Sequence, residues 1–308
     1  MNDNLRIFIC FAAKDRYKIA EPIVHHLKNY GIDIWYDRYE MVLGDNRVEK
    51  NLKEGAENCN YSLIIISENT IKSKCEIEEI NIIKKRYRSN NVTVFPVLYE
   101  ISPNNLSSDL IWIRELIFKE VDRKSGTREI CNHVACKVTG DILKQYNYQK
   151  IKDIVSLKLM PIATTAILKS YLDVDTTNLN SRISLLYASY LTIIHSEKHA
   201  EYAHIQMISK IYNRLISENN LNLNIDYRDL WLLENSMCIL CNAYLLSWIE
   251  SNIWIIVLDN NSTGSLEVNL FISPSKYGYV VKFPLTIFHI SSEIIPGYAI
   301  GIIVLCCL

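Results

Sequence analysis

Short apolar runs alternate with segments of helical periodicity along the first half of the chain, and this alternation restricts the fold more than any other feature of the sequence. The runs are RIFICF at residues 6–11, IDIWYD at 32–37, YSLIIIS at 61–67 and VTVFPVLY at 92–99. Apolar runs of this length are typical of buried strands, and strands that alternate with helices build parallel sheets. We therefore predict five strand–helix units in a doubly wound order, with the strand at 61–67 in the centre of the sheet.

Helices are predicted between these strands. Asp15 is positioned to cap a helix that ends near Tyr30, and the next helix is expected to end at Glu57. Two more helices are predicted over residues 74–88 and 125–146. In a doubly wound sheet the functional loops follow the carboxyl ends of the strands, so a site is expected at that edge.

The strand–helix alternation stops after residue 146, which predicts a domain boundary near Tyr148. Residues 150–308 are expected to form a second domain that is helical to about residue 250 and then contains a small β portion. Helices are predicted over 179–195, along a segment with one apolar face, and from about Asp229. The apolar face consists of Ile205, Ile208, Ile211 and Leu215.

The last fifty or so residues have a strand-like composition. The runs IWIIVL and LEVNLFI flank the turn-forming stretch DNNSTGS, which predicts a β-hairpin. The C-terminal run TIFHISSEIIPGYAIGIIVLCCL is interrupted by His289, Glu293 and Pro296. A membrane-spanning helix needs ~20 largely apolar residues, so we expect buried strands or a docked terminal segment here rather than a membrane anchor.

Charge and cysteine content narrow the class of partner and the compartment. The chain has 33 Lys and Arg residues against 34 Asp and Glu residues, for a net charge of -1. This balance lacks the overall basic character of a nucleic-acid-binding protein. Nine cysteines without a regular framework and a polar start, MNDNLRIFIC, favour a reducing compartment, and we predict the cytoplasm.

The candidates for a metal site are weak. Cys238 and Cys241 form a C-x-x-C pair, but the flanking residues are apolar and no second pair accompanies it. We interpret the pair as buried thiols, with a metal or redox motif as the alternative. His195, His199 and His204 have helical spacing without an associated carboxylate or cysteine, so surface or interface histidines are expected. No metal is predicted.

Three segments of the first half have the order and separation of a known family. They are the opening RIFICFAAKD, the loop WYDRYEMVLGD and the turn SEN. Together they resemble the Toll/interleukin-1 receptor (TIR) domain, which opens with F-I-S-Y-x-x-x-D, carries an E-L-x-x-G-D loop after its second strand and has an S-P-N turn after its third. The resemblance implies a TIR domain at residues 5–147 with a flavodoxin-like five-stranded parallel sheet.

Enzymatic members of that family cleave NAD with a glutamate in a W-x-x-x-E pattern. Counting from Ser67 places Cys75 at the tryptophan position and Glu79 at the glutamate position. One carboxylate suits this chemistry, because an anion stabilises the oxocarbenium-like cation formed when nicotinamide departs. Two alternatives stay open: Glu79 is one of several glutamates on a solvated helix face, or Glu78 takes its role if the helix register shifts by one residue.

The resemblance also implies contacts to the dinucleotide, carried over by position. These candidate substrate-binding residues are Phe11, Ala12, Ala13, Val42, Gly44 and Cys75. Simple core packing is an equal interpretation for Phe11, whereas Ala12 and Ala13 can contribute only backbone. Lys14 offers a charge for a phosphate.

The resemblance implies an NAD glycohydrolase or cyclase that depletes NAD or makes a cyclic ADP-ribose-type signal, as TIR proteins of bacterial antiphage systems such as Thoeris do. NAD would be the substrate, and expected partners are other TIR domains and a downstream effector that senses the nucleotide product. No nucleic acid and no membrane are expected as partners. The C-terminal domain would sense a trigger or control oligomerisation. The alternatives are a non-catalytic TIR–TIR scaffold and a decoy of host signalling.

Overall fold

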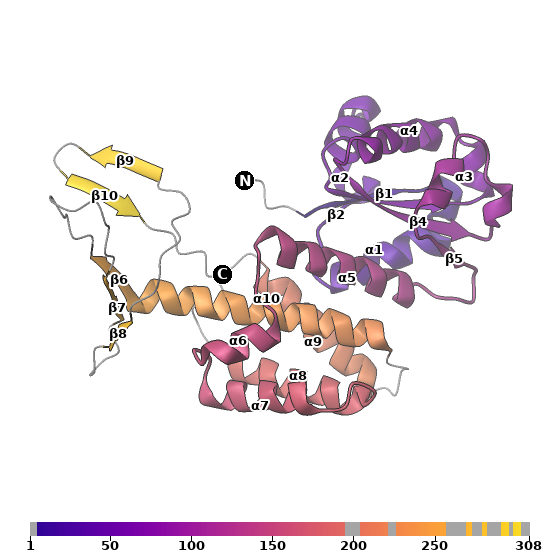
Figure 1. Cartoon of the computed structure of the whole chain (residues 1–308). Coiled ribbons are helices and arrows are strands. Elements are labelled where there is room, and N and C mark those ends of the chain that lie inside the picture. The colour runs from indigo at the N-terminus through magenta and orange to yellow at the C-terminus, as the bar shows by residue number, and fades with distance from the viewer. Residues whose placement is uncertain are drawn as a thin grey trace. The chain divides into compact units, whose positions relative to one another are not determined.

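A five-stranded parallel sheet organises the first half of the chain, as the apolar runs predicted (Figure 1). The strand order is β2-β1-β3-β4-β5, and every neighbouring pair is parallel. This is the flavodoxin-like order, with the fully buried β3 in the centre. The strands are β1 (Ile7–Cys10), β2 (Ile34–Trp35), β3 (Tyr61–Ile66), β4 (Thr93–Tyr99) and β5 (Lys119–Val121).

This computed structural model describes residues 5–194, 204–220 and 226–256, together with the strand segments 269–272, 279–281, 291–295 and 298–302. The chain divides into two compact units, Met1–Ala243 and Tyr244–Leu308. The sheet and most of the helices therefore share one unit. The domain boundary proposed near Tyr148 stays a prediction.

Helices cover both faces of the sheet. On one side α1 (Glu21–Asn29) packs against α5 (Arg128–Gln145). On the other side α4 (Lys74–Arg88) packs against η3 (Val48–Ala56), a wide helical turn of π type (Figure 1). Short helical segments connect these elements: η1 (Ala13–Asp15), η2 (Arg16–Ala20), α2 (Asp37–Glu40), α3 (Glu68–Lys72), η4 (Pro103–Asn105) and η5 (Ile111–Glu115).

The helix η3 lies unusually close to the sheet. A Cβ atom added to Gly55 would lie 2.7 Å from Cε2 of Phe8 and 3.1 Å from Cδ2 of Trp35. Only glycine permits this approach, because any side chain would overlap two packed aromatic rings. The close contact holds η3 against β1 and fixes the direction in which its polar residues point.

The prediction that Asp15 caps the first long helix is wrong. Its carboxylate instead accepts hydrogen bonds from Oγ of Ser67 and, at 2.7 Å, from Nδ2 of Asn69. The predicted single helix is divided into η1, η2 and α1, with Pro22 in the first turn of α1. A carboxylate that is buried needs donors, and the turn after β3 offers more of them than the helix terminus does.

In the part of the chain that the structure describes, five helices follow the sheet, and the apolar face predicted for residues 205–215 is buried. They are α6 (Ile151–Leu157), α7 (Ile162–Asp173), α8 (Leu179–Ile193), α9 (Ile205–Asn220) and α10 (Tyr227–Asn252). Ile208 and Ile211 of α9 have no exposed surface. The sequence predicted a helical region from residue 150 to about 250 but did not locate the first two of these helices. Among the described residues, no helix combines the length and apolar content that crossing a membrane requires.

A buried polar network joins α5 to α10. The carboxylate of Asp229, which is 1% exposed, accepts hydrogen bonds from Arg128 at 2.9 Å and from Asn132 at 2.6 Å. Its second oxygen accepts from the backbone N–H of Asp226 at 2.9 Å. The hydroxyl of Tyr30 in turn donates to Asn132. A buried charge with this many donors is well compensated, so the network stabilises the contact between sheet domain and helices.

The second unit contains short antiparallel strands. β6 (Ile253–Ile256) pairs with β7 (Asn269–Ile272), and β7 pairs with β8 (Tyr279–Val281). β9 (Ser291–Ile295) pairs with β10 (Tyr298–Ile302). The β6–β7 pairing is that of the predicted hairpin, whose connecting loop lies outside the described residues.

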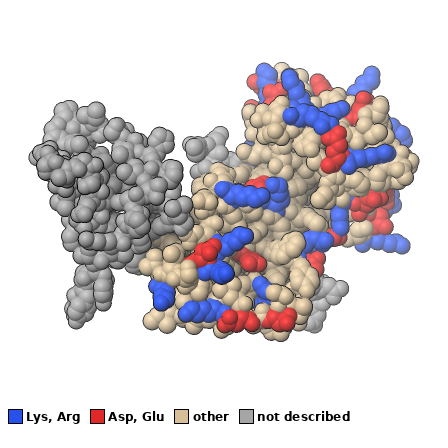
Figure 2. Space-filling model, viewed as in Figure 1, with Lys and Arg blue, Asp and Glu red and all other residues tan. Residues whose placement is uncertain are grey.

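Acidic and basic side chains are interspersed over the described surface in the view of Figure 2. Several form ion pairs one helical turn apart, including Lys50–Glu54 at 3.0 Å and Lys53–Glu49 at 2.9 Å. Exposed pairs of this kind add little to stability, because water and salt screen their charges. They identify η3 as a helix with one solvated face and one face toward the sheet.

Candidate active site

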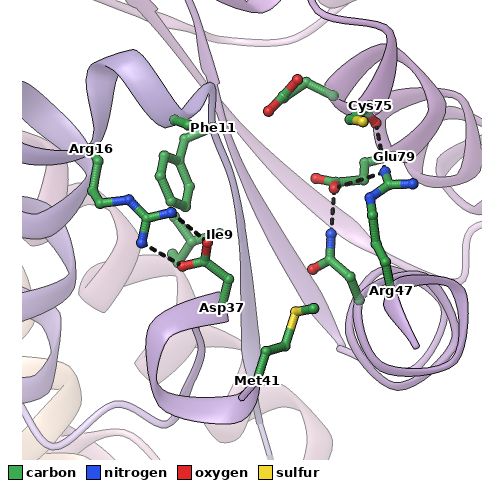
Figure 3. Close-up of a pocket in the computed structure, with 11 residues that line it drawn as sticks. Ile9, Phe11, Arg16, Asp37, Met41, Arg47, Cys75 and Glu79 are labelled. Carbon is green, nitrogen blue, oxygen red and sulfur yellow. Dashed lines mark hydrogen bonds and ion pairs between the residues drawn. The ribbon is translucent and has the colours of Figure 1, made fainter. Parts of the chain in front are cut away.

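A pocket of about 170 Å³ lies at the carboxyl ends of β1 and β2, beside the first turns of α4 (Figure 3). This is the edge at which the doubly wound topology predicts a site. Two walls face each other across it, one from the loops after β1 and β2 and one from α4 and η3. The lining residues are Ile9, Phe11, Ala13, Arg16, Asp37, Met41, Arg47, Asn51, Cys75, Glu76 and Glu79.

Glu79 lies on the inward face of α4, and only 6% of its surface is exposed. The next residues on that face are Ile80 and Ile83, which pack against the sheet with 1% and 0% exposure. The side chain of Glu78, in contrast, is 52% exposed. Helical periodicity therefore separates the neighbouring glutamates: Glu79 faces the pocket and Glu78 faces solvent. The interpretation of Glu79 as a residue of a solvated face is wrong.

Three side chains hold the carboxylate of Glu79. Nδ2 of Asn51 donates a hydrogen bond to Oε1, and Nη2 of Arg47 lies 3.5 Å from the same oxygen. The thiol of Cys10, at the end of β1, forms a further hydrogen bond with this carboxylate. Asn51 and Arg47 are one turn apart on η3, so the close packing of η3 on β1 brings both to α4.

The environment of Glu79 raises its pKa to about 7, mainly because burial disfavours the charged form. The hydrogen bond with Cys10 and the charge of Arg47 lower the pKa, and the neighbouring charge of Glu76 raises it. Both the anionic and the protonated form of this carboxyl group are therefore accessible near neutral pH. Strongly shifted carboxyl groups in a pocket are candidates for catalysis.

The opposite wall combines an aromatic ring with an ion pair. The guanidinium of Arg16 donates to both carboxylate oxygens of Asp37, at 2.7 and 3.2 Å. The same guanidinium lies 5.2 Å from the centre of the Phe11 ring and 5.9 Å from that of Tyr36. Two parallel hydrogen bonds and two cation–π contacts fix Arg16, so this wall is rigid and polar at its rim.

Four of the residues predicted to form the site line this pocket together: Phe11, Ala13, Cys75 and Glu79. The other three do not line it. Ala12 is buried at 3% exposure beside the pocket, and Val42 is 75% exposed. Gly44 has a φ of +100° in the same turn as Val42, with no atom within 4 Å of the position of a Cβ. That turn is closed by Asp45, whose N–H donates to the carbonyl of Val42 at 3.1 Å.

The sequence analysis did not identify several pocket residues. They are Ile9, Arg16, Asp37, Met41, Arg47, Asn51 and Glu76, and Cys10 contacts Glu79 beside them. Two signals were present for some of them: Asp37 ends a predicted strand, and Glu76 is three residues before Glu79 on one helix. The others have no shared local pattern, because they come from β1, from η2, from the residue after α2 and from the start of η3, and they meet only in the folded chain.

Within the described residues, no three His, Cys, Asp or Glu side chains come together in a way that could hold a metal ion. Cys238 and Cys241 are buried free thiols, in agreement with the interpretation of the C-x-x-C pair. Burial raises the pKa of Cys238 to about 12, so this thiol is protonated and unreactive at neutral pH. His195 and His199 lie outside the described residues.

Residues 7–128 match the family described as "TIR domain". The "2' cyclic ADP-D-ribose synthase BtTIR" of Bacteroides thetaiotaomicron is 28% identical over 99 residues, 32% of this chain and 34% of that protein. The "NAD(+) hydrolase TcpC" of Escherichia coli O6:H1 is 27% identical over 107 residues, 34% of each chain. The "2' cyclic ADP-D-ribose synthase AbTIR" of Acinetobacter baumannii is 24% identical over 100 residues, 32% of this chain and 37% of that protein. The matched region spans about a third of each relative.

A solved structure with a similar fold is the TIR domain of the Toll-related receptor TRR-2 from Hydra magnipapillata. The TM-score is 0.31 at 18% sequence identity, and the match covers 37% of this chain and 82% of that one.

Proposed function

Since residues 7–128 form a TIR domain, we propose that this chain cleaves the bond between nicotinamide and ribose in NAD, with Glu79 as the catalytic carboxylate. The observation that carries the proposal is the burial of Glu79 in a pocket at the carboxyl edge of the sheet. Relatives matched over the same domain are named NAD(+) hydrolase or cyclic ADP-D-ribose synthase.

The chemistry requires an anion near C1' of the ribose. Cleavage leaves an oxocarbenium-like cation, and a carboxylate stabilises it electrostatically or captures it as a short-lived ester. Asn51 and Arg47 orient Glu79 toward the cavity, which reduces the reorganisation needed during the reaction. Nicotinamide is neutral once it departs, so the reaction needs no strong general acid at the leaving group.

The size of the pocket suits one end of a dinucleotide. Its volume of about 170 Å³ is below the ~300–1,000 Å³ typical of sites that enclose a drug-sized ligand. We propose that the nicotinamide and its ribose enter between Phe11 and Glu79, while the adenosine part lies outside over the protein surface. Cys75, smaller than the family's tryptophan, leaves the α4 side of the entrance without an aromatic ring, so Phe11 supplies the ring face.

The wider role follows from the same proposal. The product is ADP-ribose or a cyclic isomer, made in the cytoplasm for antiphage defence, and a downstream effector would sense a cyclic product. TIR domains would self-associate to activate the site, and residues 150–308 would control that assembly. A non-catalytic scaffold is the second candidate, and the exposure of Val42 and Leu43, at 75% and 106%, favours it because exposed apolar loop tips suit protein contacts.

The decisive experiment incubates the purified full chain with NAD and follows nicotinamide release and nucleotide products by chromatography. Glu79→Gln is compared with Glu78→Gln, a matched control on the same helix. We expect the first variant to abolish release and the second to retain most of it, because Glu79 faces the pocket whereas Glu78 faces solvent. The assay is repeated at high protein concentration to promote assembly. Equal activity in Glu79→Gln and the unaltered protein would remove this residue from the mechanism.

A further inference from the structure

Glu76 is a second carboxylate in the pocket. It precedes Glu79 by three residues on α4, so the two side chains share the inward face of the helix, and both line the cavity. Neither the W-x-x-x-E pattern nor the proposed cleavage by Glu79 gives Glu76 a role. It is half-buried and therefore partly withdrawn from solvent.

One carboxylate oxygen of Glu76 lacks a partner. Oε2 is buried and accepts no hydrogen bond from any residue that the structure describes. The neighbouring donors are used elsewhere: Arg47 bonds Glu78 at 3.0 Å and the carbonyl of Cys75 at 3.2 Å, and Asn51 donates to Glu79. A buried acceptor without a donor is costly, and in a pocket such an atom is satisfied by a donor on the ligand.

The groups around Glu76 favour a role in accepting protons. Burial is the main cause that raises its pKa, and the charge of Asp15 raises it further. The charge of Arg47 and a backbone hydrogen bond lower it. Its own charge raises the pKa of Glu79. A carboxylate with a raised pKa is a stronger base than one in water, which suits proton transfer near neutral pH.

We propose that Glu76 is the general base of this site and accepts the proton of the hydroxyl that attacks C1' of the ribosyl group. The inference rests on the proposed NAD cleavage. The bond between C1' and the nicotinamide nitrogen breaks, and its electron pair leaves with nicotinamide. A bond then forms between C1' and the attacking oxygen, whose proton moves to Oε2 of Glu76. The oxygen belongs to water in hydrolysis and to a hydroxyl of the substrate in cyclisation.

The two carboxylates therefore divide the work. Glu79, which Asn51, Arg47 and Cys10 hold in place, stabilises the cation. Glu76 accepts the proton of the attacking hydroxyl through its unbonded oxygen. Pairs of carboxyl groups in different environments commonly take separate roles in this way. Both product classes need the same proton transfer, so Glu76 is required whichever product forms.

The test compares Glu76→Gln with Glu68→Gln, which changes an exposed glutamate on α3 that forms an ion pair with Lys72. Nicotinamide release by the full chain is measured with and without sodium azide, and thermal unfolding checks that both variants fold. Azide is an anionic nucleophile that attacks C1' without losing a proton. We expect Glu76→Gln to lose about 10²-fold in kcat, the lower range for removing a general base, and azide to restore much of it as the glycosyl azide.

Three outcomes overturn the inference. One is activity of Glu76→Gln within twofold of the unaltered protein, and another is a loss that azide does not restore, which would indicate a structural role. In both, activity of the unaltered protein and inactivity of Glu79→Gln would leave the proposed function intact. An unaltered protein that releases no nicotinamide at high concentration would overturn the proposed function and this inference together.

Discussion

Glu79 and Asp229 are both buried acidic residues in polar networks, and the two networks differ in what surrounds the carboxylate. Glu79 is 6% exposed and borders a cavity, with donors from Asn51, Arg47 and Cys10. Asp229 is 1% exposed and does not line this pocket. Both of its carboxylate oxygens accept hydrogen bonds. Burial raises the pKa of both groups.

This comparison shows that a raised pKa alone does not identify a catalytic acid. The network around Asp229 links α5 to α10 and provides donors to both carboxylate oxygens, so it serves stability. The network around Glu79 is open on one side, where a substrate can replace water. Open space next to the carboxylate separates a site from a structural ion pair, and the following predictions test that distinction.

The largest expected effect is on catalysis by Glu79, whose network is open to the pocket. Glu79→Gln should reduce NAD cleavage by about 10³-fold, because the amide cannot stabilise the cation as an anion does. The melting temperature should be unchanged or higher, since the variant no longer buries a carboxyl group that ionises. Initial rates of nicotinamide release and thermal unfolding measure the two effects. A large loss of stability would place Glu79 in the same class as Asp229.

A substitution in the network around Asp229 should lower stability and leave catalysis largely unchanged. Asp229→Ala removes the acceptor for Arg128 and Asn132 and should cost about 3 kcal/mol of unfolding free energy. Activity per folded molecule should change little, because Asp229 does not line the pocket. Urea unfolding and single-time-point NAD cleavage at low temperature check the prediction. A loss of NAD cleavage without a loss of stability would contradict a structural role for Asp229.

Stability should depend on pH through Glu79. Its pKa is raised from 4.5 to about 7 in the folded chain. The stabilising contribution of the protonated form is therefore complete below pH 4.5 and is lost as pH rises through 7, by up to about 3 kcal/mol. Urea unfolding of the unaltered protein and Glu79→Gln at pH 5 and pH 8 measures this. The unfolding free energy of Glu79→Gln, relative to that of the unaltered protein, should be higher at pH 8 than at pH 5. An equal difference at the two pH values would contradict the raised pKa of Glu79.

The smallest effect concerns a residue that positions Glu79. Asn51→Ala removes a hydrogen bond to the carboxylate, which stabilises the charged form, so the pKa of Glu79 should rise. We expect about a tenfold loss of kcat at pH 7, with the rising limb of the pH–rate profile moved to higher pH. The control is Asn58→Ala, which makes the same substitution outside the pocket lining. Asn51→Asp is not a suitable control, because it would add a charge beside Glu79. An unmoved profile would contradict a positioning role.

Local sequence patterns predicted the architecture well. The helix at 74–88 has the predicted bounds, and each of the four apolar runs contains a strand. Buried strands and amphipathic helices can be predicted in this way because each has a characteristic short-range hydrophobic periodicity. The fifth strand, β5 (Lys119–Val121), was not located. Its residues KEV are mostly polar, since it lies at the edge of the sheet and has few neighbours to pack against.

The site was predictable only in part. Spacing from Ser67 marked Glu79, whose catalytic role stays a prediction. The resemblance of the loop after β2 to the family's loop placed Val42 and Gly44 at a pocket that they do not line. Loop conformation depends on local hydrogen bonds, here those of Asp45, which position counting does not include.

The sequence by itself predicted a doubly wound parallel sheet and the resemblance of its first half to the TIR domain, because these follow from patterns within short stretches of chain. Only the tertiary structure decided which glutamate of α4 is buried, which donors hold it and that Glu76 keeps a free oxygen beside it. The reason is physical: hydrophobic periodicity is a local property, whereas burial and hydrogen bonding of a polar group depend on residues such as Cys10 and Asn51 that are distant along the chain.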